Sequence, residues 1–376
     1  MKTQEIVDRA AKGKRLSFEE GVFLLRDADF LELAEAADAV CQRKHPDGMA
    51  TFQIDRNINY TNICKNQCSF CAFYRPKGHP ESYVLSQEEI EEKVAETIEL
   101  SGTQVMLQGG INPDLKIDYY TKMFSEIKSR FNIRIHSLSP PEIVHIAESA
   151  GISISEALKG LIKAGLDSLP GGGAEILVDH VRQKISPKKI SSSQWLEVME
   201  EAHKLGLKTT ATMMIGTVET IEDRIAHLQK LRTLQDRTEG FMSFISWTFQ
   251  PRNTALGGKS VSSIEYLRML SLSRLFLDNF KNVQGSWVTQ GKDIGQVCLS
   301  FGANDLGSIM IEENVVRAAG VSHRISVDEM VDLMQRAGKI PAQRDTEFNI
   351  LKIYKSGAKR QCRHAEKTQQ SDKISF

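Results

Sequence analysis

Three cysteines stand close together in this chain, and their spacing suits metal chemistry. Cys64, Cys68 and Cys71 follow the pattern CxxxCxxC within the segment YTNICKNQCSFCAFYR, whereas the remaining cysteines lie far away, at positions 41, 298 and 362. Such a distribution is a poor disulfide framework and indicates metal binding instead. Three thiolates from one loop can ligate three irons of an iron–sulfur cube and leave the fourth iron open to another ligand.

Two alternatives to a cluster remain open at this point. His79 lies near the triplet and supplies a possible fourth ligand, which a structural zinc site requires. No second CxxC or HxxxH pair accompanies the triplet, and this weighs against zinc. The three thiols can also be purely structural. The spacing therefore favours a cluster over both alternatives.

The overall composition excludes several classes of protein. The 376 residues include 48 Lys and Arg against 48 Asp and Glu, and 41% are hydrophobic, which is ordinary for a globular protein. A net charge of zero offers no basic excess for nucleic acid or an anionic membrane. The N-terminus is charged throughout, and no window approaches 18 uninterrupted apolar residues. We therefore expect a cytoplasmic protein that binds neither nucleic acid nor membrane.

Alternating strand and helix patterns must position the cysteine loop. Eight short apolar or β-branched runs alternate with amphipathic stretches, and strands are predicted over 51–60, 103–110, 133–139, 166–172, 208–216, 241–249, 283–289 and 302–308. This pattern predicts a parallel (β/α)8 barrel of the TIM type, with a doubly wound sheet as the alternative. The predicted divisions are an N-terminal helical extension over 1–47, the barrel over 48–310, and a C-terminal helical extension with a flexible tail over 311–376. The cysteine loop follows the first strand, at the carboxyl mouth where such barrels place active sites.

The cysteine triplet, with Phe70 directly before its third member, resembles the signature of the radical S-adenosylmethionine (SAM) superfamily. The resemblance implies a 4Fe–4S cluster held by the three cysteines, with SAM chelating the open iron. One electron from a low-potential donor, such as flavodoxin or ferredoxin, then splits SAM into methionine and a 5′-deoxyadenosyl radical. The barrel positions these reactants and excludes water.

Further residues acquire cofactor roles only through this resemblance. Superfamily members carry a Gly-Gly pair after the second strand, where bare backbone approaches the methionine amino group. The implied cofactor-binding residues are Phe70, Gln108, Gly109, Gly110, Ser137 and Glu175. The glycines can also be a simple turn, and Glu175 can instead cap the following helix.

A narrower resemblance covers almost the whole chain. Segments such as LPGGGAEILVDHVRQKISPKKI, QGSWVTQGKDIGQ and FGANDLGSIMIEENVVRAAG resemble the dehypoxanthine futalosine cyclases of menaquinone biosynthesis. The related aminofutalosine synthases and F0 synthase subunits share the cysteine loop and are the alternative. The resemblance implies hydrogen abstraction at ribose C4′ of the small-molecule substrate dehypoxanthine futalosine. The C4′ radical then adds to the benzoate ring.

Residues predicted at the barrel mouth are candidates for holding this substrate. They are Arg56, Tyr60, Trp247, Gln250, Trp287, Thr289, Gln290 and Asn304. Trp287 and Gln290 are expected to line the folded substrate, because a flat apolar wall beside a hydrogen-bond donor suits a ring next to a polyol. Asp305 is a candidate catalytic base or a helix N-cap. A non-catalytic iron–sulfur carrier is the competing class, although carriers normally ligate every iron with protein.

Overall fold

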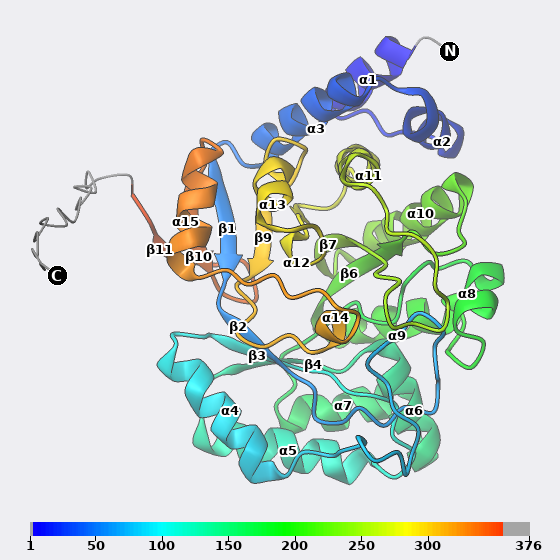
Figure 1. The fold of residues 1–376 in the computed structure, drawn as a ribbon, viewed down its shortest axis with the longest axis vertical. Coiled ribbons are helices and arrows are strands. Elements are labelled where there is room, and N and C mark those ends of the chain that lie inside the picture. The colour runs from blue at the N-terminus through cyan, green and yellow to red at the C-terminus, as the bar shows by residue number, and fades with distance from the viewer. Residues whose placement is uncertain (1–2, 356–376) are drawn as a thin grey trace, which may run out of the picture.

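A curled, mostly parallel sheet forms the centre of the protein, with helices around its outside (Figure 1). The computed structural model describes residues 3–355. Within this range, eleven strands join one sheet in the order β11-β10-β1-β9-β8-β7-β6-β5-β4-β3-β2. The strands are β1 (Met49–Gln53), β2 (Asp55–Ile58), β3 (Gln104–Leu107), β4 (Arg134–Ser137), β5 (Ser168–Leu169), β6 (Lys208–Ile215), β7 (Phe241–Thr248), β8 (Asn282–Gln284), β9 (Asp305–Ser308), β10 (Ile340–Arg344) and β11 (Ile350–Ile353).

The sheet closes on itself through its first chain segment. β1 and β2 are two halves of one extended run, separated only by Ile54. β1 pairs in parallel with β9, and β2 pairs in parallel with β3. The run of parallel strands from β1 through β9 to β3 and β2 therefore starts and finishes on one chain segment, so it curls into a barrel. The predicted barrel fold is therefore confirmed, and the doubly wound alternative is wrong.

Helices occupy the connections between strands, and two of them begin at Ser-x-x-Glu capping boxes that are visible in the sequence. Ser86 and Glu89 form a capping box at the start of α4, and Ser326 and Glu329 form another at α15. The main helices after the first strand are α4 (Gln87–Glu99), α5 (Ile117–Arg130), α6 (Pro140–Ala150), α7 (Ile154–Ala164), α8 (Asp179–Ile185), α9 (Ser192–Lys204), α10 (Ile221–Thr238) and α11 (Ser263–Phe276). The later ones are α12 (Trp287–Gln290), α13 (Lys292–Cys298), α14 (Val315–Ala318) and α15 (Val327–Arg336).

Three helices precede the first strand. They are α1 (Thr3–Ala11), α2 (Phe18–Asp27) and α3 (Phe30–Lys44). α2 contacts α10 and α11, and α3 contacts α11, so this extension covers one side of the barrel (Figure 1).

The C-terminal extension is not purely helical, which corrects the sequence prediction. β10 joins β1 in parallel, and β11 returns antiparallel to β10. The hairpin was missed because its strands are only five and four residues long and lie after the last predicted barrel strand. The predicted flexible tail falls largely on residues 356–376, which lie outside the described residues.

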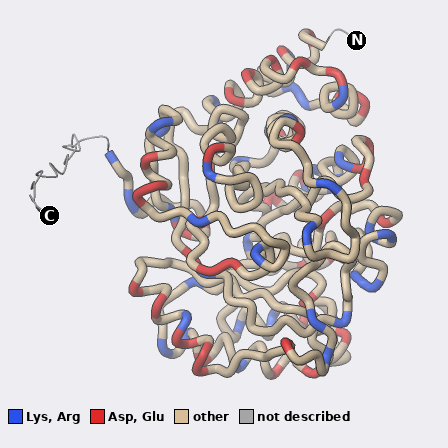
Figure 2. Tube along the Cα trace, in the orientation of Figure 1, with Lys and Arg blue, Asp and Glu red and all other residues tan. Residues whose placement is uncertain are grey.

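Charged residues of both signs are interspersed along the described chain (Figure 2). No helix within residues 3–355 has the length and apolar character needed to cross a bilayer.

Candidate active site

The cysteine loop leaves β2 after Ile58 and is tied back onto itself. The Cys64 N–H donates to the Arg75 carbonyl at 3.1 Å, and the Arg75 N–H donates to the Asn62 carbonyl at 2.8 Å. The Cys71 N–H donates to the Cys68 carbonyl at 3.1 Å. All three cysteines line one cavity of about 220 Å³ at the carboxyl mouth of the barrel. The three cysteines that are close in the sequence therefore also surround one cavity in the structure.

The donor set of this cavity suits an iron–sulfur cubane. Three thiols border one space, and a cubane attaches each of three cysteines to a different iron. Residues 3–355 contain no group of three His, Cys, Asp or Glu side chains arranged to hold one metal ion. Burial raises the pKa of Cys68 to about 12 and also raises that of Cys71. Such groups stay protonated until a metal cation replaces the proton.

The Gly109–Gly110 pair lies directly against the cysteine loop. A Cβ on Gly110 would stand 2.3 Å from the Ile63 carbonyl oxygen and 2.9 Å from the Cys64 Cβ. Only glycine permits this approach, because any side chain would push the cysteine loop away. The pair also lines the cysteine cavity, together with Gln108 and Phe70. Glycine is therefore required at these two positions so that the segment can pack against the loop that carries the thiols.

Glu142 holds this glycine segment in place, and sequence reasoning missed it. The carboxylate accepts the Gly109 N–H at 3.1 Å and the hydroxyl of Tyr60. It also accepts the N–H and hydroxyl of Ser139, as a capping box at α6. That Ser-x-x-Glu pattern was the available signal. Tyr60 is corrected from a substrate contact to a buried support, because its hydroxyl is committed to Glu142.

Glu175 lies between the cysteine cavity and the barrel interior. Its Oε1 accepts from Lys189 Nζ at 2.9 Å, and its Oε2 lies 3.7 Å from Arg182 without a hydrogen bond in the described chain. α8 begins only after Val178, so Glu175 does not cap that helix. Lys189 also lies 5.1 Å from the centroid of the Phe70 ring. Sequence reasoning missed Lys189, which no motif marked.

Ser137 does not join this group. Its hydroxyl donates to the Leu107 carbonyl at 2.6 Å, and the residue is fully buried outside the cavity lining. The predicted cofactor contact is therefore corrected to a link between β3 and β4.

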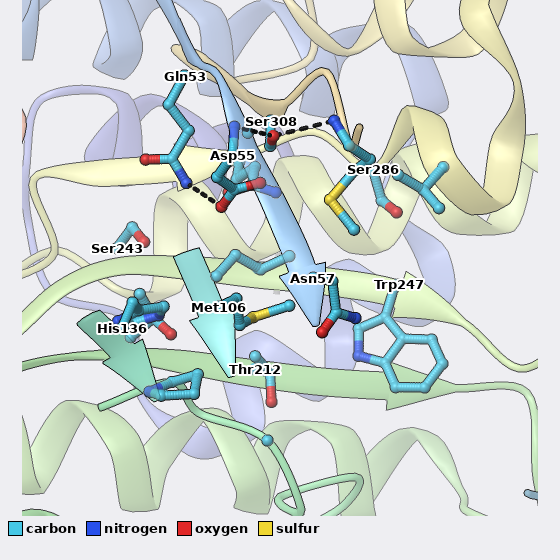
Figure 3. A pocket seen from close by; sticks show the side chains of 18 of the residues that line it. Gln53, Asp55, Asn57, Met106, His136, Thr212, Ser243, Trp247, Ser286 and Ser308 are labelled. Carbon is cyan, nitrogen blue, oxygen red and sulfur yellow. Dashed lines mark hydrogen bonds between the residues drawn. The ribbon is translucent and has the colours of Figure 1, made fainter. Parts of the chain in front are cut away.

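A second cavity of about 300 Å³ fills the barrel interior (Figure 3). Alternate residues of each strand point inward, and here many of them are polar. The polar lining residues on strands are Gln53, Asp55, Asn57, Gln104, His136, Thr210, Thr212, Ser243, Gln284 and Ser308. This lining meets the cysteine cavity at Gln108, Gly172, Gly173, Glu175, Trp247 and Val315, which border both. The two cavities are thus continuous.

Four of the predicted substrate residues lie at the carboxyl mouth of the barrel. Trp247 borders both cavities, and Thr289 lines the barrel cavity. Gln290 donates to the Thr248 hydroxyl at 2.8 Å, and Gln250 donates to the Thr248 carbonyl at 3.1 Å. Both glutamines lie outside the lining of the barrel cavity.

Trp287 does not line the barrel cavity, contrary to the sequence prediction. It is 1% exposed, and its indole N–H donates to the Ser308 carbonyl at 3.0 Å. It borders an outer hollow formed with residues 310–313 and 321–324, and it is absent from the barrel cavity lining. The tryptophan that faces the cavity is Trp247, on β7.

The structure also corrects the roles predicted for Arg56, Asn304 and Asp305. Arg56 donates to Glu96 Oε2 at 2.6 Å, so it faces α4 on the outside of the barrel. β9 begins at Asp305, so Asn304 and Asp305 stand at the amino end of this strand, opposite the cysteine mouth. Asn304 accepts from the buried Arg274 at 2.6 Å.

Asp305 is neither a base in the cavity nor a helix cap. It is fully buried and accepts two hydrogen bonds from Arg344, at 2.6 and 3.0 Å. It also accepts from the Thr51 hydroxyl at 2.6 Å. Arg344 comes from β10, and Arg344, Thr346 and Phe348 line the deep end of the barrel cavity. The C-terminal hairpin therefore contributes to the cavity, and Asp305 anchors it there.

Two family models match most of the described chain. A model of the radical SAM superfamily matches residues 58–231, and one described as the CofH/MqnC C-terminal region matches residues 238–357. The solved structure of methylornithine synthase shares the fold, with a TM-score of 0.70 at 21% identity over 90% of this chain and 97% of that one. Fold and cysteine loop thus define a radical SAM enzyme.

Relatives narrow this class. Cyclic dehypoxanthine futalosine synthase of Halalkalibacterium halodurans is 48% identical over 94% of this chain and 96% of that protein. The synthase of Streptomyces coelicolor is 48% identical over 93% and 89%. The 5-amino-6-(D-ribitylamino)uracil–L-tyrosine 4-hydroxyphenyl transferase of Archaeoglobus fulgidus is 40% identical over 80% and 88%. The chain belongs to the radical SAM family that contains these futalosine synthases and transferases.

Proposed function

We propose that this enzyme cyclises dehypoxanthine futalosine, as a step of menaquinone biosynthesis. The observation that carries the proposal is the 48% identity to two cyclic dehypoxanthine futalosine synthases over nearly the whole chain. In the proposed reaction, the C4′ hydrogen of the ribose is abstracted, and the C4′ radical adds to the benzoate ring. Loss of one electron and one proton then restores the aromatic ring.

The cysteine cavity is the proposed cofactor site. Cys64, Cys68 and Cys71 would hold a 4Fe–4S cluster, and SAM bound beside it would supply the 5′-deoxyadenosyl radical. The backbone of Gly109 and Gly110 lines one wall of this cavity, where SAM would lie. Glu175, paired with Lys189, supplies a fixed acceptor where the two cavities meet. A low-potential flavodoxin or ferredoxin is the proposed electron donor.

The barrel cavity is the proposed substrate site. Its lining of amide and hydroxyl groups suits a ribose, because buried polar groups need hydrogen-bond partners. The sugar must reach the radical, so it belongs where the cavities meet, near Gln108 and Trp247. The aromatic ring then extends into the barrel interior, where it folds against the sugar. Holding both groups in one cavity favours intramolecular attack over loss of the radical.

An anaerobic assay tests this proposal against its nearest alternative. Reconstituted enzyme is incubated with SAM, a reductant and dehypoxanthine futalosine, and products are followed by mass. The parallel incubation contains tyrosine and 5-amino-6-(D-ribitylamino)uracil, because a transferase with that specificity is 40% identical. We expect cyclised product and 5′-deoxyadenosine only in the first incubation. Turnover of the tyrosine pair alone would refute the cyclase assignment and retain the radical SAM class.

Trp247→Ala should uncouple radical formation from cyclisation. The indole of Trp247 borders both cavities, so its loss leaves the sugar radical without a wall that directs it onto the ring. We expect cyclised product to fall at least about tenfold more than 5′-deoxyadenosine does, which corresponds to about 1.4 kcal/mol of lost discrimination. The ratio of the two products measures this effect.

Trp247→Phe is the matched control for that prediction. Phenylalanine retains a flat apolar wall, so the product ratio should stay near that of the unsubstituted enzyme. Equal losses of both products in Trp247→Ala would contradict the role and place this residue in cofactor binding.

A further inference from the structure

Asp55 is a buried carboxylate of the barrel cavity with one unused oxygen. The residue lines the cavity and is 3% exposed. Its Oδ2 accepts from Gln53 Nε2 at 3.0 Å (Figure 3). The same oxygen accepts from Gln104 Nε2 at 2.7 Å. Its Oδ1 has no hydrogen-bond partner among residues 3–355. A buried carboxylate oxygen without a partner is costly for folding, so it calls for an explanation.

The other carboxylates around this cavity lie against cations or backbone N–H groups. Glu175 Oε1 is paired with Lys189 at 2.9 Å, and its Oε2, which also has no hydrogen-bond partner in the described chain, lies 3.7 Å from the Arg182 guanidinium. Glu313 accepts the backbone N–H groups of Val315 and Val316 at the start of α14. The nearby guanidinium of Arg344 is held by Asp305 on two hydrogen bonds. Among the three carboxylates that line the cavity, Asp55 is the one held only by neutral amides of side chains.

The position of Asp55 suits the aromatic end of a substrate. It begins β2 and is level with Gln104, whereas Asn57, Met106 and His136 form the next level toward the carboxyl mouth. The proposed sugar position lies beyond that level, at Gln108 and Trp247. A ring that extends inward from the sugar therefore points toward Asp55.

The proposed cyclisation creates a proton that must leave this part of the cavity. When the C4′ radical bonds to a ring carbon, that carbon keeps its hydrogen and the ring becomes a cyclohexadienyl radical. Aromaticity returns when the C–H bond breaks, its electron pair stays in the ring, and one electron passes to a one-electron oxidant of the iron–sulfur class. We propose that Asp55 is the catalytic base that accepts this proton on Oδ1. This inference rests on the proposed function.

The surroundings of Asp55 support this role over that of its neighbour His136. Burial raises the pKa of Asp55, and a carboxylate with a raised pKa is a stronger proton acceptor. Burial lowers the pKa of His136 to about 3, which makes its imidazole a weak base. Gln53 and Gln104 hold Oδ2 by hydrogen bonds, so the whole carboxylate, Oδ1 included, keeps a constant orientation beside the cavity.

Asp55→Asn tests the proposal in the reconstituted full-length enzyme. The amide has the shape of the carboxylate, and its oxygen can still accept from Gln53 and Gln104. We expect 5′-deoxyadenosine formation within about threefold of the unsubstituted enzyme, because the radical step does not need the base. Cyclised product should fall by about a hundredfold or more, as general bases typically contribute. An unchanged product ratio would overturn the proposal.

A second variant and a binding measurement separate catalysis from structure. Gln104→Leu removes one amide that orients Asp55 and should lower the product ratio in the same direction by a smaller factor. Calorimetric affinity of the reconstituted protein for dehypoxanthine futalosine, measured anaerobically without SAM or reductant, should stay within about threefold in Asp55→Asn. A large loss of affinity with an unchanged product ratio would make Asp55 a binding group and overturn its role as a base.

The outcome for the unsubstituted enzyme keeps the two proposals distinct. If that enzyme does not turn over dehypoxanthine futalosine, the proposed function fails and the inference on Asp55 fails with it. If it does, and Asp55→Asn matches it, only the inference fails.

Discussion

Replacing any one of Cys64, Cys68 and Cys71 with serine should reduce turnover below detection, whereas Cys298→Ser should retain most of it. The three thiols share one cavity, and each is expected to ligate a different iron. A serine hydroxyl is a poor ligand for this soft metal centre, so the cluster is lost or displaced. Iron and acid-labile sulfide, about four of each per chain in the unsubstituted enzyme, measure the loss directly.

Cys298 is a suitable control because it is also buried but lies elsewhere. It is fully buried, and its Sγ lies 4.0 Å from the Tyr266 hydroxyl, which can accept a hydrogen bond from serine. Electron paramagnetic resonance of the reduced protein, with and without SAM, shows whether an open iron is present. Tight stoichiometric zinc in place of iron would contradict the prediction.

The parts of the site that follow from short-range patterns could be predicted from the sequence. The cysteine spacing places three thiols on one loop, and the alternation of strand and helix patterns gives a parallel barrel. The two together put the loop at the carboxyl mouth, where the structure has it. The capping boxes at Ser86 and Ser326 were equally local signals.

Roles that depend on distant partners could not be predicted in this way. Arg56 and Tyr60 lie on or just beyond the first barrel segment, but their partners Glu96 and Glu142 stand 40 and 82 residues away. Whether a polar side chain faces the cavity or the helices depends on strand register, because a shift of one residue reverses its direction. The eighth strand was predicted over 302–308, but it begins at Asp305, so Asn304 and Asp305 stand at its amino end rather than at the cysteine mouth.

The polar residues on the first two strands already indicated a cavity inside the barrel. Gln53, Asp55 and Asn57 occupy every second position of the first segment, and Gln104 and Gln108 lie on either side of Met106 at the inward positions of the second. Barrel interiors usually hold bulky branched residues, so polar residues at every second position indicate a binding cavity. Read in that way, the sequence would have placed Asp55 rather than Asp305 in the interior.

Asp305→Ala should destabilise the protein strongly, because it leaves a buried cation without its partner. The carboxylate of Asp305 is fully buried and accepts two hydrogen bonds from Arg344 and one from Thr51. Removing one partner of a buried ion pair typically lowers the free energy of unfolding by about 3–5 kcal/mol. Chemical denaturation of the unsubstituted and substituted chains measures the difference. Asp38→Ala is a control, since its pair with Lys339 lies near the surface, with 24% of the Asp38 side chain exposed.

Substitutions in the Asp305–Arg344 ion pair show whether Asp305 stabilises the fold or acts as a catalytic base. Replacing both partners, as Asp305→Leu with Arg344→Met, removes both charges and should recover much of the lost stability, because no uncompensated charge remains in the interior. Asp305→Asn should lower stability and leave the ratio of cyclised product to 5′-deoxyadenosine unchanged. A catalytic base would behave in the opposite way, with normal stability and a reduced ratio. The hairpin of β10 and β11 is also held by the parallel pairing of β10 with β1 and by the 2.8 Å hydrogen bond from Arg344 to Gln53, so loss of the Arg344–Asp305 pair should lower stability without releasing the hairpin.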